Sequence, residues 1–256
     1  MYEALAVARY EYRMQIRRWG LWLGLLLSTG LFYWFLVVGL DTIPPQVLSN
    51  PWDFGANLIL PLILLAPVAA GILVADRFPR DRQLRMNELL ESSQPSARIF
   101  VLGRYIASLL AVLTPPLLLA LPVIIYAAVR FSLPELLWKT PVIFLAAALP
   151  SWLFIVAWSL TIPLVMPLRL YQVLYSGFWL WAIAVPRGRL PTINESIVDI
   201  GGKYASYAFF GFERPPNLNP PATAGWAIFN ISLEVGLAVV GVAATGLVKR
   251  WQEQRQ

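Results

Sequence analysis

The residue types that usually carry chemistry are scarce in this chain. It has no cysteine and no histidine, which excludes thiol chemistry, haem ligation by His or Cys, His-based zinc motifs and Ser-His or Cys-His catalytic arrangements. Its one Gly-Lys dipeptide, Gly202-Lys203, is followed by Tyr204 and lacks the upstream glycine of a phosphate-binding P-loop. We therefore expect no enzyme activity, no metal site and no ATPase site in this chain.

Glu234 is a carboxylate well inside an apolar run, residues 223–248. Ionised groups are costly inside a bilayer, so it is a candidate functional residue that could bind a cationic substrate or carry a proton. The alternative is that it pairs with a polar group on a neighbouring span. Together with Glu234, the aromatic residues Tyr175, Phe178 and Trp179 are candidates for lining a path for hydrophobic cargo, although aromatic side chains facing lipid are common.

Charge is concentrated in one stretch, "ADRFPRDRQLRMNELLESSQPSARIFVLGR" at 75–104, which holds ten of the 34 charged residues. The whole chain is only 13% charged, against about 25% in soluble domains. Helical spacing gives the stretch an apolar and a charged face, formed by Met86, Leu89 and Leu90 and by Arg85, Glu88 and Glu91. Either a soluble partner grips the apolar face of this short helix, or the stretch is a solvated determinant of membrane topology.

The elements that position these residues are six nearly uncharged runs. A bilayer core about 30 Å thick needs about 20 apolar helical residues to cross it. The predicted spans are 19–40, 54–75, 105–129, 140–168, 170–186 and 223–248. The fifth has 17 residues and is either a short span or a re-entrant segment. The fold class is therefore an all-α integral membrane protein with one transmembrane domain over 1–256.

Prolines interrupt these predicted spans. Pro115, Pro116 and Pro122 predict kinks or a broken helix in the third, because each removes a backbone donor and clashes with the preceding turn. Pro150 and Pro163 predict a tilt or bend in the fourth, which at 29 residues is too short to cross twice.

Three predicted pieces lie outside the spans. Residues 1–18 predict an amphipathic helix along the cytoplasmic interface, with one apolar side formed by Tyr2, Leu5, Tyr12, Ile16 and Trp19. Residues 76–104 form a cytoplasmic loop. Residues 187–222 form an external segment that is too long for a turn, and its semi-apolar part predicts short helices dipping into the outer interface.

The distribution of Lys and Arg predicts the orientation. With a cytoplasmic N-terminus, the inner connections receive 14 of the 20 basic residues and the outer ones six, so both termini are expected to be cytoplasmic. Because the basic residues flank the apolar runs, topology explains the net charge of +6 better than nucleic-acid binding does. Glu3 and Glu11 interrupt what would be a basic leader region, so no cleavable signal peptide is expected.

The charged stretch and the residues after it, "ADRFPRDRQLRMNELLESSQPSARIFVLGRYIASLL", resemble the loop between spans two and three of the ABC type-2 permeases. These are the membrane subunits of ABC exporters with the type V fold. The matching features are Asp76-Arg77, Arg80 to Arg82, Glu88-Leu89-Leu90, Pro95 and Gly103-Arg104. Two positions depart from the family pattern: Arg85-Met86 replaces a frequent Gly-Thr, and Arg104 replaces a Lys.

The resemblance implies a permease that forms a homodimer or heterodimer in the cytoplasmic membrane, among lipids. Two separate nucleotide-binding subunits would bind ATP and Mg and would move a hydrophobic or amphipathic substrate outwards. It also implies a coupling helix that contacts the ATPase through Arg82, Arg85, Met86, Glu88, Leu89, Leu90 and Glu91. The alternative function is a gradient-driven secondary carrier with Glu234 as its coupling site. An intramembrane enzyme has almost no catalytic set here.

Overall fold

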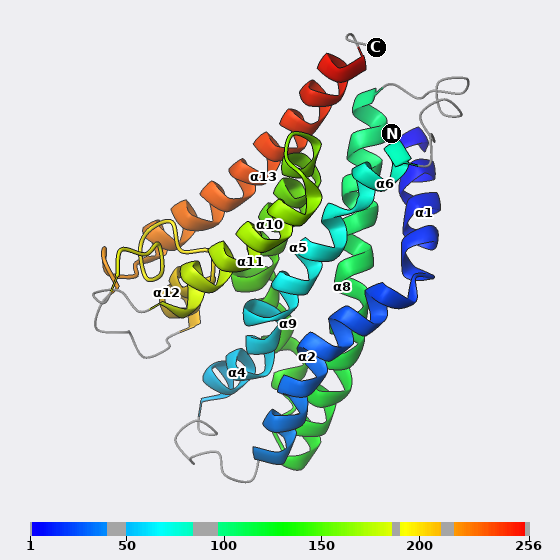
Figure 1. Cartoon of the computed structure of the whole chain (residues 1–256). Coiled ribbons are helices and arrows are strands. Elements are labelled where there is room, and N and C mark those ends of the chain that lie inside the picture. Colours follow the sequence, from blue (N-terminus) through cyan, green and yellow to red (C-terminus); the bar gives the residue numbers. More distant parts are fainter. Residues whose placement is uncertain (1, 40–49, 84–96, 186–189, 211–217, 254–256) are drawn as a thin grey trace.

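The computed structural model describes residues 2–39, 50–83, 97–185, 190–210 and 218–253 (Figure 1), and their regular structure is helical apart from isolated bridge positions, of which Ser196 and Asn219 pair with each other. This confirms the all-helical prediction. Within these ranges, five helical stretches are long and apolar enough to cross a membrane: Trp19–Gly39, Pro51–Arg80, Ile99–Arg130, Leu136–Leu164 and Ala224–Gln252. The chain therefore has the character of a multi-pass membrane protein.

The first two of these stretches start close to where the sequence predicts them. Helix α2 spans Trp19–Gly39, and the second stretch begins with α4 (Pro51–Leu64), three residues before the predicted start. The reason is a helix cap: the side chain of Asn50 accepts a hydrogen bond from the Trp52 N–H at 3.1 Å, and a proline at the first helical position suits a helix start. The stretch continues through α5 (Ala66–Ala75) and α6 (Arg77–Gln83).

Helix α8 (Ala97–Arg130) is the longest element, with 34 residues and a length of about 51 Å. It runs without a break through Pro115, Pro116 and Pro122, so the prediction of a broken helix is wrong. The helix packs against α1 and α2. Because a bilayer core is about 30 Å thick, part of α8 extends beyond it.

The fourth stretch is one helix with two irregular turns. It consists of α9 (Leu136–Ile143), a π-helical turn η2 (Phe144–Ala148), α10 (Leu149–Thr161) and a 3-10 turn η3 (Ile162–Leu164). It starts four residues before the predicted start. The π turn lies directly before Pro150 and the 3-10 turn contains Pro163, so the helix is irregular at both prolines, where a bend is predicted.

Two further helices complete the bundle. Helix α11 (Leu168–Ala184) packs against α5, and its 17 residues measure about 26 Å. Helix α13 (Ala224–Glu253) packs against α10. The predicted fifth span thus forms a helix, although it is shorter than the five long ones.

Helix α1 (Tyr2–Ile16) runs lengthwise beside the first half of α8 (Figure 1). The predicted apolar side is divided. Leu5 and Trp19 are 67% and 80% exposed, whereas Tyr12 and Ile16 pack into the bundle. The buried face of α1 instead includes Glu11, a position that the predicted apolar side does not include.

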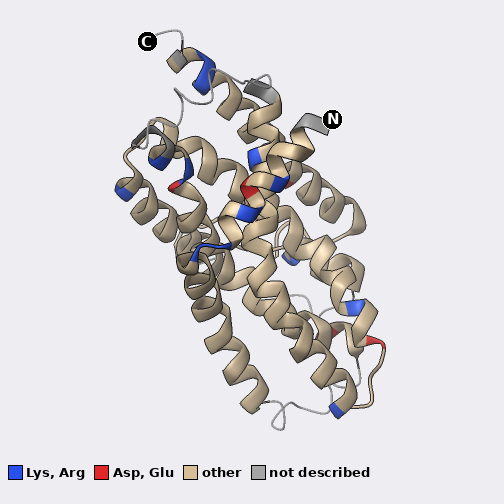
Figure 2. Cartoon of the chain, turned by 90° about the vertical axis from the view of Figure 1, so that its right-hand side faces the viewer, with Lys and Arg blue, Asp and Glu red and all other residues tan. Residues whose placement is uncertain are grey.

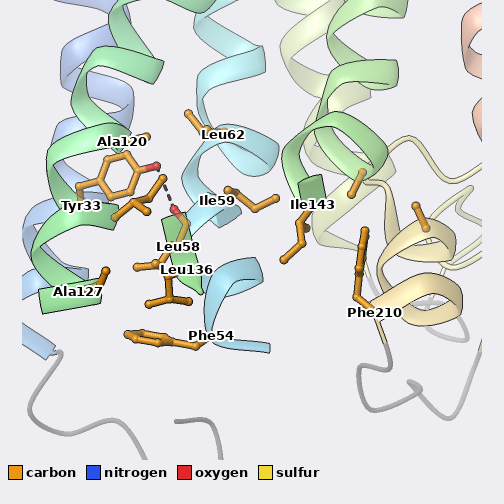
Figure 3. Close-up of a cluster of buried hydrophobic side chains, with 14 residues drawn as sticks. Tyr33, Phe54, Leu58, Ile59, Leu62, Ala120, Ala127, Leu136, Ile143 and Phe210 are labelled. Carbon is orange, nitrogen blue, oxygen red and sulfur yellow. Dashed lines mark hydrogen bonds between the residues drawn. The ribbon is translucent and has the colours of Figure 1, made fainter. Parts of the chain in front are cut away.

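At the end of the bundle opposite the termini, the described part of the segment predicted to be external, which we continue to call the external segment, folds back onto the spans. Its helix α12 (Lys203–Phe210) contributes Phe210 to a buried apolar cluster with Phe54 and Ile143 (Figure 3). In the same cluster, the Tyr33 hydroxyl donates to the Leu58 carbonyl at 3.0 Å. The prediction of a short helix in this segment is confirmed, and the helix is packed into the protein.

Gly202 fixes the entry to α12. Its φ of +67° lies in the left-handed region, and a Cβ at this position would lie 2.0 Å from the Ala147 carbonyl oxygen in the π turn. Only a glycine allows the external segment to approach the π turn this closely.

We predict that Gly202→Ala lowers the thermal unfolding midpoint in detergent, because the added methyl group forces the segment away from Ala147 and strains the backbone. Gly177→Ala is the matched control, since a Cβ there meets nothing within 4 Å and alanine favours a helix. Equal midpoints for the two variants would contradict this account of Gly202.

Candidate functional site

A buried ion cluster joins α1, the start of α6 and the first half of α8. The Glu11 carboxylate accepts hydrogen bonds from Arg77 Nη2 at 2.6 Å and from Arg104 Nη2 at 2.7 Å, and all three residues are buried. Burial alone would raise the pKa of Glu11, but the charges and hydrogen bonds of Arg104 and Arg77 outweigh it and lower that pKa below its usual value. The carboxylate is therefore held ionised.

A glycine on α8, Gly103, allows α1 to pack close enough to form this cluster. A Cβ on Gly103 would lie 2.8 Å from the Ala4 carbonyl oxygen, so the close approach of α1 to α8 needs a residue without a side chain. One turn further along, Gln15 Nε2 donates to Ser108 Oγ at 3.0 Å. The dipeptide Gly103-Arg104, part of the family resemblance, thus seats α1 against α8.

Aromatic rings extend the cluster to α13. The Arg104 guanidinium lies 4.8 Å from the ring centroids of both Phe78 and Phe100. Lys249 Nζ, near the end of α13, lies 5.1 and 4.6 Å from the same two rings. Such cation–aromatic contacts contribute about 0.5 to 2 kcal/mol each. Helix α13 therefore meets the helices that flank the charged stretch.

A second ion pair lies at the junction of α1 and α2. Arg18 donates to both carboxylate oxygens of Asp76, at 2.9 and 3.3 Å, and both side chains are partly exposed. The described Lys and Arg residues gather mainly around the half of the molecule that carries the two termini, with a smaller group at the opposite end (Figure 2). The ion cluster and this pair together hold both flanks of the predicted cytoplasmic loop.

Within the predicted cytoplasmic stretch 76–104, α6 and the first residues of α8 occupy the two ends. Arg82 lies within α6. The other residues predicted to couple to an ATPase lie in 84–96, outside the described residues: Arg85, Met86, Glu88, Leu89, Leu90 and Glu91.

Two of the residues predicted to line a substrate path donate hydrogen bonds to backbone carbonyls where the helix is interrupted between α4 and α5. Tyr175 donates its hydroxyl to the Pro67 carbonyl at 2.6 Å, and Trp179 Nε1 donates to the Leu64 carbonyl at 2.8 Å. The helix breaks at Leu65 and Pro67 has no N–H, so backbone carbonyls here need other donors in an apolar setting. These side chains thus support α11 against α5.

The four residues predicted to line a path do not form one site. Phe178 is exposed at the surface, and Glu234 is buried beside Ser151, whose Oγ lies 3.0 Å from Glu234 Oε2. This pairing matches the alternative in which Glu234 meets a polar group on a neighbouring helix.

A separate apolar pocket of about 510 Å³ lies between α4, α8 and the α9–η2 helix. It is lined by Ile59, Leu62, Leu117, Leu121 and Phe144 among others, and none of the four predicted path residues lines it. Its two polar lining residues are threonines. The lining suits a hydrocarbon group better than a charged one.

Sequence reasoning missed the ion cluster. The available signal was the spacing of Ala8, Glu11 and Gln15, which places small and polar residues along one face of a helix otherwise expected to bury apolar side chains. The basic partners were visible only as topology signals, because sequence alone does not bring α1 beside the two flanks of the loop.

The chain matches no family model, no curated protein and no solved structure. Among the described residues, no group of three or more acidic side chains could hold a metal ion.

We predict that Glu11→Gln destabilises the protein by about 3 to 5 kcal/mol, because two buried guanidinium groups then lose their shared carboxylate. Asp76→Asn is the matched control, and it should cost about 1 kcal/mol or less, since the Arg18 pair is partly exposed. Reversible unfolding in mixed detergent measures both. Similar losses of unfolding free energy in the two variants would show that burial does not make the Glu11 cluster more stabilising than the partly exposed Arg18–Asp76 pair.

The lowered pKa of Glu11 also predicts a pH dependence. A carboxyl whose pKa is lower in the folded protein stabilises it at all pH values above its usual pKa, and this contribution is lost as the pH falls through the lowered value. Stability should therefore fall in acid in the wild-type protein, and this fall should be smaller in Glu11→Gln. Unfolding measured across acidic buffers tests this, and parallel pH profiles would contradict it.

Proposed function

We propose that this chain is the permease subunit of an ATP-driven exporter of the ABC type-2 class. Two permease chains, identical or different, would bind separate nucleotide-binding subunits and move a hydrophobic or amphipathic substrate outwards across the cytoplasmic membrane. ATP and Mg would bind to the partner ATPase, and this chain would act as a transport subunit without enzyme activity.

The observation that carries this proposal is the ion cluster. Glu11, Arg77 and Arg104 connect the N-terminal helix to the helices before and after the loop that resembles the family's coupling loop. A force applied to the loop would reach α1, α6 and α8 together, since a buried and paired ion cluster resists separation. A loop that served only as a topology signal would not need this connection.

The apolar pocket supports the proposed class of substrate. It opens between three spans, and an acyl chain or similar hydrocarbon group would meet mainly aliphatic and aromatic side chains there. We assign the substrate path to this pocket in preference to Tyr175 and Trp179, whose hydroxyl and indole groups are engaged with backbone carbonyls.

In this proposal α11 also crosses the membrane, as the fifth of six spans, and both termini are cytoplasmic. The 17 residues of α11 fall at the short end of the range for a crossing helix. A crossing here also keeps the basic residues at the end of α13, Lys249 and Arg250, on the same side as the basic residues of α1.

The second candidate is a gradient-driven carrier with Glu234 as its coupling site, which the burial of this carboxyl favours. It ranks lower because it assigns no role to the ion cluster beside the loop. Purification of the tagged chain from its native host separates the two functions. An ATPase that copurifies supports the exporter, whereas transport that persists under ATP depletion without such a partner supports the carrier.

We predict that Leu89→Asp combined with Leu90→Asp abolishes copurification of the ATPase and ATP-dependent transport, because charged side chains would replace the proposed apolar contact. Leu190→Asp, at a position 60% exposed in the external segment, is the control and should preserve both. Matched gel-filtration profiles would establish that each variant is folded. Transport that survives the double change would exclude these leucines as the coupling contact.

A further inference from the structure

The external segment is fastened to the spans by two polar side chains. Asn230 Nδ2, on α13, donates to the carbonyls of Ile197 and Asp199, each at 2.9 Å. Ser151 Oγ, on α10, lies 2.5 Å from the Ile200 carbonyl oxygen. Three backbone carbonyls within residues 197–200 are therefore held from two different helices, shortly before α12 begins.

Ser151 faces two acceptors with one hydrogen. Its Oγ lies within hydrogen-bond distance of both the Ile200 carbonyl and Glu234 Oε2, at 3.0 Å. A hydroxyl donates one hydrogen bond and accepts others, and a carbonyl can only accept. If Ser151 donates to Ile200, its contact with Glu234 is satisfied only when Glu234 carries a proton and donates it to Ser151.

The surroundings contain more acceptors than donors. Asn230 Oδ1, one helical turn before Glu234, is buried without a hydrogen-bond partner among the described residues. Lys203, the nearest basic residue of the segment, is engaged elsewhere: its Nζ donates to Asn194 and lies 3.8 Å from Asp199. Within the part of the chain that the structure describes, a buried carboxylate at Glu234 would thus lack a cation, and a protonated carboxyl supplies a missing donor.

The other ionisable groups nearby belong to the segment. Asp199 is buried, accepts N–H bonds from Glu195 and Gly201 at 2.7 Å, and repels an ionised Glu234. Tyr204 donates its hydroxyl to the Pro220 carbonyl, and Tyr207 is subject to the charges of Glu195 and Asp199. Helix α10 contains no ionisable residue, and among the described residues the hydrogen-bond partner of Glu234 is Ser151 of that helix.

We propose that Glu234 is a proton-binding site that latches the external segment. The protonated carboxyl completes a series of hydrogen bonds from Glu234 on α13 through Ser151 to the Ile200 carbonyl. Loss of the proton to the medium releases the segment. On ionisation, Ser151 turns its single hydrogen from the Ile200 carbonyl towards the carboxylate. The segment then loses one attachment and Glu234 faces the charge of Asp199. This inference is independent of what drives transport.

The absence of native cysteine makes the latch measurable. In Ala205→Cys the thiol replaces a fully buried methyl group on α12, and in Val198→Cys it lies at a position 39% exposed in the same segment. Both variants are labelled with a membrane-impermeant maleimide at each pH. The ratio of their two labelling rates cancels the intrinsic effect of pH on the reaction of a thiol with the reagent. We expect this ratio, buried over exposed, to rise several-fold from mildly acidic to mildly alkaline buffer.

Glu234→Gln is the decisive variant, because its amide donates to Ser151 at every pH and cannot ionise. The ratio should stay low throughout the pH series in this background. A flat ratio in the wild-type background, or an equal rise in Glu234→Gln, would overturn the proposal.

Ser151→Ala tests the same connection if the Gln variant does not accumulate. Removing the hydroxyl should make Ala205→Cys label rapidly in acid as well, with little further change as the pH rises. Slow labelling in acid, followed by a rise like that of the wild type, would show that Ser151 does not link Glu234 to the segment.

Discussion

The carboxylate of Glu11, shared by Arg77 and Arg104, sets the arrangement of the half of the molecule that carries the termini. If either guanidinium moved away, a buried charge would be left without its partner, so α1, α6 and α8 behave as one body there. Arg104 and Lys249 both contact the rings of Phe78 and Phe100, and this shared contact attaches α13 to the cluster. The flanks of the charged loop therefore connect to most of the bundle through a few polar groups.

Irregular helices are tolerated here because side chains from neighbouring helices serve the exposed backbone. Trp152 Nε1 donates to the Leu62 carbonyl at 2.9 Å, in the turn before the α4–α5 break, and Tyr175 and Trp179 serve carbonyls at the break itself. In an apolar environment an unsatisfied carbonyl is expensive, so each of these bonds also specifies which helix lies beside the break. The aromatic residues of α11 thus have a structural role that their composition did not reveal.

Sequence reasoning predicted the helical class, the approximate limits of the long apolar helices and a helix in the external segment. These follow from local properties, namely apolar length and the spacing of residues along a helix. It did not predict the buried position of Glu11 or the pairing of Ser151 with Glu234, since both depend on contacts between residues 66 or more positions apart. The expected break in the third span was also wrong, because α8 runs continuously through its three prolines.

Because α8 is one continuous helix, the number of residues between two positions on it fixes the angle between the directions in which they face. Arg104 near one end and Leu117 and Leu121 near the middle belong to the same rod, and each residue turns the rod by about 100°. Insertion of a single residue between them would leave the helix intact but turn the pocket wall away from α4 whenever Arg104 kept its contact with Glu11. Changes of side chain in this interval are therefore easier to accommodate than changes of length, and any twist of α8 at the ion cluster arrives at the pocket as a rotation of its wall.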